Sequence, residues 1–542
     1  MDSESYGEKR DGDSDVNSRH VELSAAAVDT GARFAVSGEA TIDHNESIRI
    51  RRKIDRNILP MMCLLYLVQF MDKTTLGYAA ILGMNQEAHL TTDQYNWLGT
   101  IFYLSYLVFE YPQNLALQRF PVGKWMSINI FVWSVALCSH AACKSFGGLF
   151  AARFILGICE GSITAGFMIV SSMFYTRKEQ TLRVGYWCLL VDVTSPNERN
   201  GTNHTRLRCI RLVEHYQGQI RTMAMADDYY WAAYICAFNL LLVFLPRFSN
   251  KCVVRVKLDQ KLRKTLTFNR FLTPNERALA VQRIKSNQTG VENKHFKKEQ
   301  MIEAFLEPKT WLFFVFSIFD NIPNSLTNQG TIIITSFGFT TLQTTLLGCV
   351  SGVVEIATIW SGVEISSRIP NSRAYVGAIY FLPSLLGVFL VNLLPWSDQV
   401  GLLFSVWLGT IQITAFVMAL AWVSATTAGH TKKITMNAIM LCGYCIGNAV
   451  GPFMWQEKYK PRNHVPWIII GVCYVVSIIL LMIIRAHLAI ENKRRDAESI
   501  DSTYDDIYIE LVKSDGVTEK VKVDKPFLDL TDVQNRDFRY VL

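Results

Sequence analysis

The chain has 542 residues, half of them hydrophobic, and only 19% are charged. A soluble protein of this size usually carries about 25% charged residues, so the composition excludes an ordinary soluble enzyme. The net charge of +7 is carried by basic loops between long apolar segments, a pattern typical of a membrane protein and not of one that binds nucleic acid.

Ten apolar segments are each long enough to cross a bilayer as a helix, which takes about 20 residues. Every backbone polar group in lipid must be satisfied within its own segment, so we expect α-helices throughout. The ten segments lie near 58–82, 97–118, 124–143, 149–173, 311–336, 342–363, 374–394, 401–424, 434–455 and 466–485. Weaker candidates near 184–193 and 230–246 would bring the total to twelve.

Lys and Arg gather in alternate loops, as in "RIRRKIDR", "YTRKEQTLR" and "ENKRRD". Such residues favour the cytosolic side of a membrane, so the alternation predicts an even number of spans with both termini in the cytosol. The expected parts are a disordered N-terminal tail over 1–53, a six-helix half over 54–246 that is anomalous at 188–229, a basic central loop over 247–310, a second six-helix half over 311–490 and a C-terminal tail over 491–542.

Two loops repeat one pattern. "LQRFPVGKW" and "SSRIPNSRA" share R-[FI]-P-x-[GS]-[KR], and each follows the second span of its half. The basic residues of the pattern are Arg119, Lys124, Arg368 and Arg373. Equivalent loops in both halves indicate an internal duplication of six helices.

Several spans carry ionisable side chains, which cost about 2.5–3.5 kcal/mol at mid-membrane and therefore normally face the bundle interior. In the first span, Gln69, Asp72 and Lys73 share one helical face. Similar stripes contain Tyr103, Tyr106 and Glu110 in the second span, Arg153 and Glu160 in the fourth, Asn321, Asn324 and Asn328 in the seventh, and Glu355 in the eighth. Pro323 should weaken the seventh helix among its polar residues.

Each of these residues also has a structural interpretation. Asp72 and Lys73 would hold helices together if they paired with the opposite charges of the fourth span. Glu110 would serve as an anchor near the cytosolic end, and the tyrosines would simply pack. The spacing of Gly157 and Gly161 is typical of close helix packing. Polar faces from several helices nevertheless converge on one place, which favours a central, water-accessible solute site.

At these residues the chain resembles a known family. "GLFAARFILGICEG" fits the pattern L-x3-R-x3-G of the major facilitator superfamily at Leu149, Arg153 and Gly157. "QYNWLGTIFYLSYLVFEYP", "FLEPKTWLFFVFSIFDNIPN" and "TTAGHTKKITMNA" resemble the fungal anion:cation symporter family, and most of all its allantoate permease-like branch. The resemblance covers about 54–187 and 271–490.

This resemblance implies an all-α integral membrane protein with a twelve-helix major facilitator fold, and a transporter rather than an enzyme. It implies proton-coupled uptake, by alternating access, of a small organic anion such as allantoate, ureidosuccinate, nicotinate or a related carboxylate. No cofactor is expected besides the coupling proton. A monomer in the lipid bilayer of the fungal plasma membrane is the expected form.

Residue roles follow from the matched motifs and the charges. Lys73 and Arg153 would attract the carboxylate of the substrate, while amides of the seventh span would bind it from the other half. Asp72, Glu110 or Glu160 would carry the proton, because burial raises a carboxyl pKa and a nearby cation lowers it. The paired basic loops, together with His430 and Lys432 of the "GHTKK" loop, would have structural or gating roles.

The chain also departs from the family. Gln118 and Ser367 stand where many members have an acid, which puts an acid-mediated lock between helices in doubt in both halves. The stretch 188–270 has no apolar run for a complete fifth helix. An exon-boundary or frame error in the gene model explains this, and so does a divergent insertion. A non-functional product and a non-transporting nutrient sensor are therefore the alternatives to a transporter.

Overall fold

The computed structural model describes residues 21–22, 44–82, 84–143, 145–188, 272–284, 295–498, 507–512, 518–522 and 528–542. Two features predicted from the sequence, the anomalous stretch after residue 188 and the weak span at 230–246, therefore lie outside the described residues. The weak span at 184–193 is helical up to Cys188 and lies outside the described residues after it. The ten stronger spans fall on described helices.

The N-terminal group of helices is here called the N-half. It consists of α2 (His44–Asn57), α3 (Leu59–Leu82), α4 (Met84–Glu87), α5 (Thr92–Arg119), α6 (Val122–Ala142), α7 (Phe146–Phe174) and α8 (Arg177–Cys188). The connecting helices are α11 (Pro274–Ile284) and α12 (Lys298–Leu306). The C-half consists of α13 (Pro308–Asn321), η2 (Pro323–Ser325), α14 (Leu326–Ser336), α15 (Thr341–Arg368), α16 (Arg373–Leu393), α17 (Gln399–Gly409), η3 (Thr410–Gln412), α18 (Ile413–Ala425), α19 (His430–Val450), η4 (Gly451–Met454), η5 (Glu457–Tyr459) and α20 (His464–Asp496).

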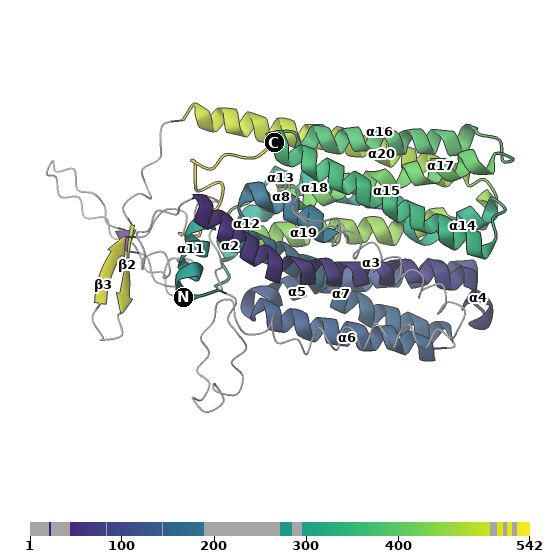
Figure 1. Ribbon diagram of the computed structural model, residues 1–542, viewed down its shortest axis with the longest axis horizontal. Coiled ribbons are helices and arrows are strands. Elements are labelled where there is room, and N and C mark those ends of the chain that lie inside the picture. Colours follow the sequence, from purple (N-terminus) through teal and green to yellow (C-terminus); the bar gives the residue numbers. More distant parts are fainter. Residues whose placement is uncertain are drawn as a thin grey trace, which may run out of the picture.

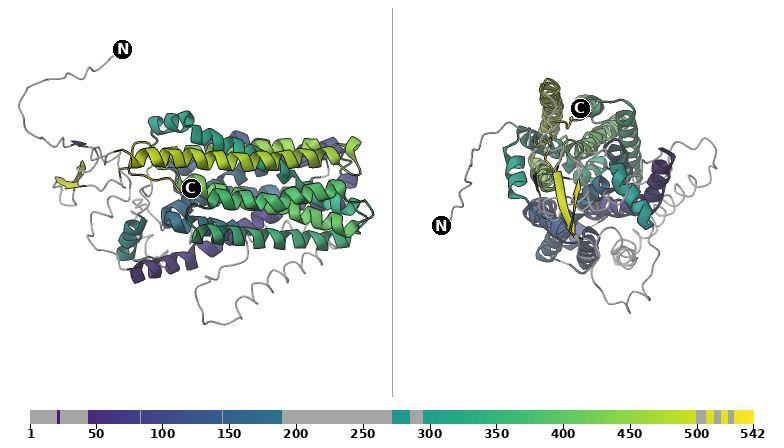
Figure 2. Two further views of the ribbon diagram at one scale, coloured as in Figure 1. Left: turned by 90° about the horizontal axis from the view of Figure 1, so that it is seen from above. Right: turned by 90° about the vertical axis from the view of Figure 1, so that its left-hand side faces the viewer.

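The long helices of both halves run side by side along the length of the molecule (Figure 1). The halves meet where α5 packs on α19, where α14 packs on α3, and where α8 packs on α15 and α18. The two ends of this bundle differ. One end carries α2, α11 and α12 and is here called the basic end, because α2 alone contributes five Lys or Arg residues between 49 and 56 (Figures 1 and 2).

Six described helices are long and apolar enough to cross a membrane: Val122–His140, Phe146–Phe174, Arg373–Leu393, Gln399–Ala425, His430–Met454 and His464–Asp496. The predicted spans at 58–82, 97–118, 311–336 and 342–363 are also helical, as α3, α5, α13 with α14, and α15.

The outer faces of the bundle are apolar. On α20 an exposed stripe repeats every three or four residues, and its members are Ile468, Val472, Val475, Ile479 and Ile483. Their exposed fractions range from 43% to 59%. Large apolar stripes of this kind are rare on soluble monomers, and they are what a lipid-facing helix requires.

Glycines permit close contact between helices in both halves. A Cβ on Gly157 of α7 would lie 2.2 Å from the carbonyl oxygen of Phe102 on α5, so only glycine fits there. In the C-half, Gly443 and Gly447 lie on successive turns of α19, and Gly451 follows one turn later at the start of η4. A Cβ on any of them would lie 2.5–2.6 Å from a backbone carbonyl oxygen of the segment that leads from α13 to η2. Small residues at helix interfaces are the usual means of packing within membranes.

Pro323 interrupts the seventh span as predicted. The proline lacks the amide hydrogen that an α-helix needs at this position, and the chain forms the 3-10 turn η2 between α13 and α14. A second break, η3, divides α17 from α18. Both breaks place irregular backbone inside the helical bundle, where the neighbouring helices surround it.

The segment before the first span is not disordered throughout, because α2 begins at His44 within the tail expected over 1–53. Ile50 and Ile54, one helical turn apart, are buried against the bundle. The Nη2 of Arg183 on α8 lies 2.8 Å from Oδ2 of Asp55, and Lys53 donates to Glu276 of α11 at 2.7 Å. Burial and ion pairs therefore hold α2 in place.

A small sheet lies beyond the basic end (Figure 1). Strand β1 (Val21–Glu22) pairs in parallel with β2 (Ile507–Val512), and β2 pairs antiparallel with β3 (Thr518–Lys522). The register aligns Val21 with Ile507. This sheet joins parts of the two predicted tails.

Candidate solute pathway

Glu160 and Gln69 lie together at the centre of the N-half. Gln69 of α3 donates from Nε2 to Oε1 of Glu160 on α7 at 2.7 Å, and both side chains are buried. The glycines of α7 let α5 and α7 approach closely, which brings this polar face into the bundle interior. The structure thus brings together two of the residues that the sequence had singled out.

Asp72 has a different neighbour from the one predicted. Its Oδ2 accepts a hydrogen bond of 3.0 Å from the indole Nε1 of Trp133 on α6, and the carboxylate is fully buried. Residues three apart on a helix differ by about 60° in direction, so Asp72 reaches α6 while Gln69 reaches α7. The side chain of Lys73 lies outside the described residues.

We expect that replacing Trp133 with phenylalanine will lower the stability of the folded protein by about 1–3 kcal/mol, because a buried carboxylate oxygen loses its donor while the aromatic volume is largely kept. The measurement is the thermal unfolding of the purified protein in detergent. Trp97→Phe is the matched control, because Trp97 is 43% exposed. Equal unfolding temperatures for the two variants would contradict a structural role for the Trp133 indole.

Arg153 is a buried cation on the same helix as Glu160, two turns away. Its side chain is on the bundle side of α7, and the residue is only 8% exposed. The Nε atom has no hydrogen-bond partner among the described residues. A guanidinium that is buried with unused donor capacity is costly unless an anion joins it.

The aromatic residues of α5 meet the C-half at Tyr444 of α19. Its ring centroid lies 5.8 Å from that of Tyr103 and 6.1 Å from that of Tyr106. One turn further along α5, Glu110 accepts a hydrogen bond of 2.6 Å from Asn114, while its buried Oε2 has no hydrogen-bond partner in the described part of the chain. The predicted stripe on the second span therefore faces the other half.

In the C-half, amides of the interrupted seventh span gather around Asn448 of α19. Asn324 donates to Oδ1 of Asn448 at 2.7 Å, and Asn448 donates to Asn321 at 3.4 Å. The side chain of Asn328 is not among the described ones. Glu355 of α15 is half-buried, and no described contact joins its carboxylate to this cluster.

The two repeated loops are not equivalent in their contacts. Arg119 and Lys124 are exposed, and Arg368 is exposed and pairs with Glu364 on its own helix. Arg373 is buried and reaches across the halves, donating to Thr181 Oγ1 of α8 at 2.7 Å. The acceptor in this contact between the halves is the neutral Thr181 hydroxyl and not a carboxylate. This agrees with the absence of an acid from the loop sequence.

At the basic end, Gln118 takes part in a second inter-half contact. Its Nε2 donates to Thr431 Oγ1 on the first turn of α19 at 3.1 Å. The neighbouring residues of the "GHTKK" loop contact the C-terminal part of the chain: the His430 amide donates to Asp529 Oδ1 at 2.7 Å, and Lys432 Nζ lies 2.9 Å from Asp532 Oδ1.

At the opposite end the halves also touch. Gln329 of α14 donates to Asn96 of α5 at 3.3 Å, and Thr100 of α5 donates to the carbonyl of Ala449 at 3.1 Å. A small pocket opens beside these contacts, and it is lined by Leu76, Tyr95, Asn96, Gly99, Ser325, Gln329 and Pro452.

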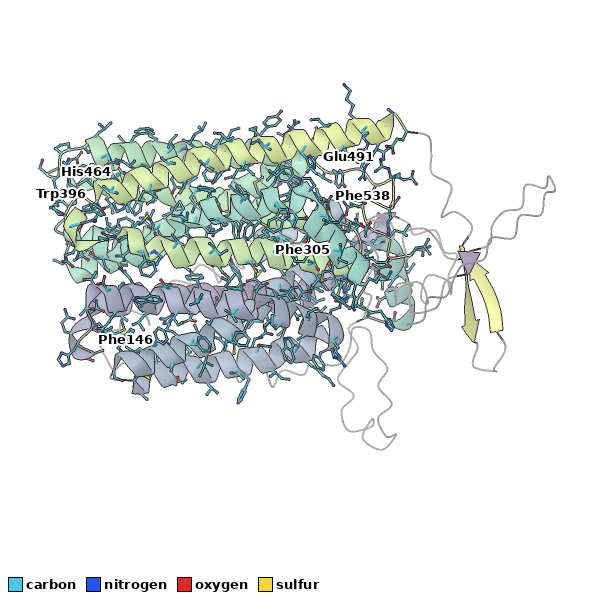
Figure 3. All side chains as sticks on the ribbon, turned by 180° about the vertical axis from the view of Figure 1, so that it is seen from behind. Phe146, Phe305, Trp396, His464, Glu491 and Phe538 are labelled. Carbon is cyan, nitrogen blue, oxygen red and sulfur yellow. The ribbon has the colours of Figure 1, made fainter. Side chains whose placement is uncertain are left out.

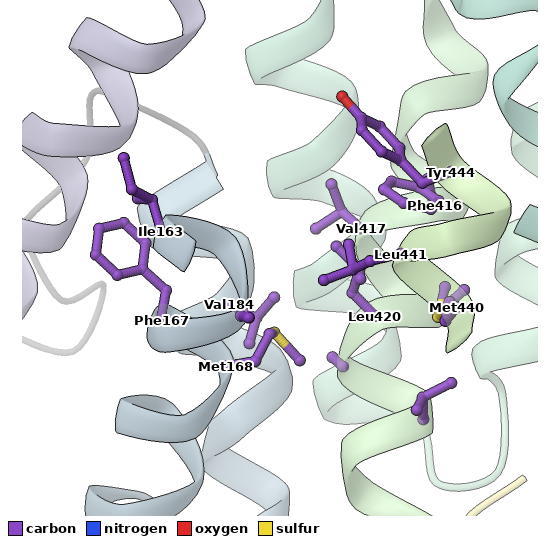
Figure 4. Close-up of a cluster of buried hydrophobic side chains, with 14 of the residues drawn as sticks. Ile163, Phe167, Met168, Val184, Phe416, Val417, Leu420, Met440, Leu441 and Tyr444 are labelled. Carbon is purple, nitrogen blue, oxygen red and sulfur yellow. The ribbon is translucent and has the colours of Figure 1, made fainter. Parts of the chain in front are cut away.

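Towards the basic end, apolar side chains fill the space between the halves (Figure 4). Met168 of α7 and Val184 of α8 face Leu420 and Leu441 of the C-half, and all four are at most 6% exposed. Described residues of the two halves are thus in contact at both ends, and the buried polar residues lie between these contacts.

Residues 62–192 match the family model of the Major Facilitator Superfamily. An uncharacterized transporter of Schizosaccharomyces pombe is 32% identical over 91% of this chain and 84% of its own length. Allantoate permease of Saccharomyces cerevisiae is 29% identical over 93% of this chain and 88% of its own. The solved structure of the proton:xylose symporter XylE superposes with a TM-score of 0.56 at 12% identity, covering 81% of this chain and 96% of that one.

Two helical halves with lipid-facing outer surfaces and buried polar residues between them define a multi-pass membrane transporter, and not an enzyme. The chain belongs to the Major Facilitator Superfamily, and its curated relatives are fungal transporters. The fold and family predicted from the sequence are therefore confirmed.

Proposed function

We propose that the protein takes up a small organic anion together with a proton, by alternating access of its two halves around the buried polar residues. The class of solute is suggested by the similarity to allantoate permease over most of both chains. Allantoate, ureidosuccinate, nicotinate and related carboxylates are the candidates. No further cofactor takes part, and the protein acts as a monomer.

The observation that carries this proposal is that a buried cation and a buried acid lie two turns apart on one face of α7. The Arg153 guanidinium is buried with an unpartnered Nε in the described part of the chain, so it is suited to bind a carboxylate. Seven residues later, the Glu160 carboxyl is buried and hydrogen-bonded to Gln69. The anion would bind at Arg153 and the proton at Glu160.

Coupling then follows from charge. An ionised Glu160 puts a second negative charge two turns from an anion bound at Arg153 and repels it, whereas a protonated Glu160 does not. Proton binding on the outer side therefore favours anion binding, and release of both follows when the halves open inwards. Asn321, Asn324 and Asn448 would supply hydrogen bonds from the C-half, because they form a polar cluster on α13, η2 and α19.

We further propose that the basic end faces the cytosol, with both termini on that side, in the plasma membrane of a fungal cell. The many Lys and Arg residues of α2 at that end support this orientation. Helix α20, which carries the exposed apolar stripe, runs along the length of the bundle, as a membrane-crossing helix must (Figure 3).

The proposal predicts that uptake of a labelled carboxylate will be faster at external pH 5 than at pH 7 and will stop when a protonophore is added. The measurement uses yeast that lacks its own permease, with cells carrying an empty vector as the control. The expressed transcript is first sequenced across codons 183–275, so that the residues following α8 are established. Uptake that is indifferent to pH and to the protonophore would exclude proton symport, and the absence of uptake for every carboxylate tested would exclude the anion.

A further inference from the structure

The last described residues, 528–542, form a segment that packs against the basic end of the C-half and is here called the C-terminal clamp. Figure 3 shows Phe538 of this segment beside Glu491 of α20, at the same end as Phe305 of α12. Leu528, Thr531, Asp532 and Phe538 are at most 2% exposed. Such burial is unusual for a polar segment outside the helices of the bundle, and it shows that this segment is tied down.

A buried carboxylate holds the clamp to two helices. Asp532 is fully buried, and its Oδ2 accepts hydrogen bonds of 2.8 Å from Lys309 Nζ and 2.6 Å from the Tyr540 hydroxyl. Its Oδ1 lies 2.9 Å from Lys432 Nζ. Both lysines are fully buried, and they lie in the first turns of α13 and α19 respectively.

The charge of this carboxylate is stabilised by its surroundings. Burial by itself would raise the pKa of Asp532, but the Lys309 and Lys432 ammonium groups and the hydrogen bonds from Lys309 and Tyr540 lower that pKa well below its ordinary value. Glu303 and Glu307 balance the second lysine at 2.8 Å each. The clamp therefore remains charged and paired at physiological pH.

The clamp also supplies the cap that α19 lacks. The residue before α19 is Gly429, which has no side chain to accept from the first amides of the helix, and its φ is +86°. Asp529 of the clamp accepts from the His430 amide at 2.7 Å, and Asp532 accepts from the Ala428 amide at 3.2 Å. Carboxylates at a helix N-terminus also interact favourably with the helix dipole.

The capped turn is the same turn that contacts the N-half. Gln300 of α12 accepts from the Thr431 amide at 3.1 Å and donates to the carbonyl of Asp529 at 2.8 Å. The hydroxyl of Thr431 in turn accepts from Gln118 at the end of α5 at 3.1 Å. A continuous chain of hydrogen bonds therefore leads from the clamp through α19 to the N-half.

We propose that the C-terminal clamp is a latch that stabilises the closed contact between the halves at the basic end. It does so by fixing the first turn of α19, on which the Thr431 hydroxyl is presented to Gln118. Loosening the clamp frees this turn and weakens the contact, whereas the contacts at the opposite end are unaffected. The latch operates whichever solute the protein carries, because none of its members belongs to the candidate anion or proton site.

Hydrogen–deuterium exchange of the full chain in detergent tests the latch without an assay of transport. In Asp532→Asn, we expect amides of the clamp and of the start of α19 to exchange at least about tenfold faster than in the wild type. Amides at the end of α5, which no described hydrogen bond or ion pair joins directly to the clamp, should exchange at least about threefold faster. Asp496→Asn is the matched control, because it removes an acid that pairs with Arg539 of the clamp at 2.7 Å on the exposed surface.

Faster exchange at the end of α5 in Asp532→Asn, with wild-type exchange in Asp496→Asn, supports the latch. Wild-type exchange at the end of α5 despite a loosened clamp would overturn it, as would equal effects of the two substitutions. Tyr540→Phe covers the case in which Asp532→Asn does not fold, since it removes one donor to Asp532 and keeps the ring. It should raise exchange at the same three places by a smaller factor, and an unchanged end of α5 in that variant overturns the latch equally.

Discussion

Replacing Glu160 with glutamine should abolish accumulation of the anion driven by a pH gradient while leaving exchange of the anion across the membrane intact. Symport of a monoanion with one proton moves no net charge, so each unit of pH difference supports about tenfold accumulation. Glutamine has the shape of glutamate and can still accept from Gln69, but it does not ionise, so the accumulation ratio should fall to about one. The measurement compares accumulation with counterflow exchange in proteoliposomes.

Glu364→Gln is the control for this substitution. Glu364 lies on α15 and pairs with the exposed Arg368 at 2.6 Å, remote from the residues proposed to bind the anion and the proton. It should accumulate the anion as the wild type does. If Glu160→Gln still accumulates the anion tenfold per pH unit, the proton is carried elsewhere, and Asp72 and Glu110 become the residues to test.

Replacing Gly157 with alanine should destabilise the fold by about 3 kcal/mol or more, which is the upper part of the range for overpacked sites. The added Cβ would lie 2.1 Å from Ser105 Oγ and 2.2 Å from the carbonyl oxygen of Phe102. The serine can rotate away, but the carbonyl belongs to the backbone of α5, so the two helices must separate. Thermal unfolding and the yield of monodisperse protein in detergent measure the effect.

Gly147 on the same helix is the matched control, because a Cβ there meets nothing within 4 Å. Alanine has the higher helix propensity, so Gly147→Ala should leave stability unchanged or raise it by about 0.5–1 kcal/mol. The two substitutions are chemically identical and have opposite expected signs. Equal effects would mean that α5 and α7 are not in the close contact described.

Periodic features of the sequence predicted most of the fold. The ten firm apolar segments, the repeated loops and the break at Pro323 are local patterns, and each corresponds to a described helix, connection or 3-10 turn. The close packing expected at Gly157 and Gly161 was also recognisable, because small residues four apart make a groove on any helix. These predictions needed only the direction of each side chain around its own helix axis.

The partners of the polar residues were harder to predict. Trp133, Tyr444 and Asn448 were not singled out from the sequence, yet they contact Asp72, Tyr103 and the amides of the seventh span. Nothing local distinguishes an indole in an apolar helix that donates to a carboxylate from one that faces lipid. The spacing of Gly443, Gly447 and Gly451 was a usable signal, since it marks the face of α19 that packs on α13 and carries Asn448 nearby.

The tail regions were the least predictable. The sequence over 491–542 reads as a polar tail, but α20 extends to Asp496 and residues 528–542 bury Asp532 between two lysines. Those lysines lie 223 and 100 residues earlier in the chain, respectively, and the sequence shows their charges only as parts of separate motifs. An acid in a polar tail has no local feature that indicates burial.

Taken by itself, the sequence determined that this chain is a helical membrane protein of two repeated halves, because hydrophobic length, charge asymmetry and internal repetition are properties of the chain that do not depend on its folding. Only the tertiary structure decided which polar groups meet: Gln69 with Glu160, Trp133 with Asp72, and Asp532 with Lys309 and Lys432. The physical reason is that a buried charge is tolerated only beside a specific partner, and that partner comes from another helix whose place is set by the packing of the whole bundle.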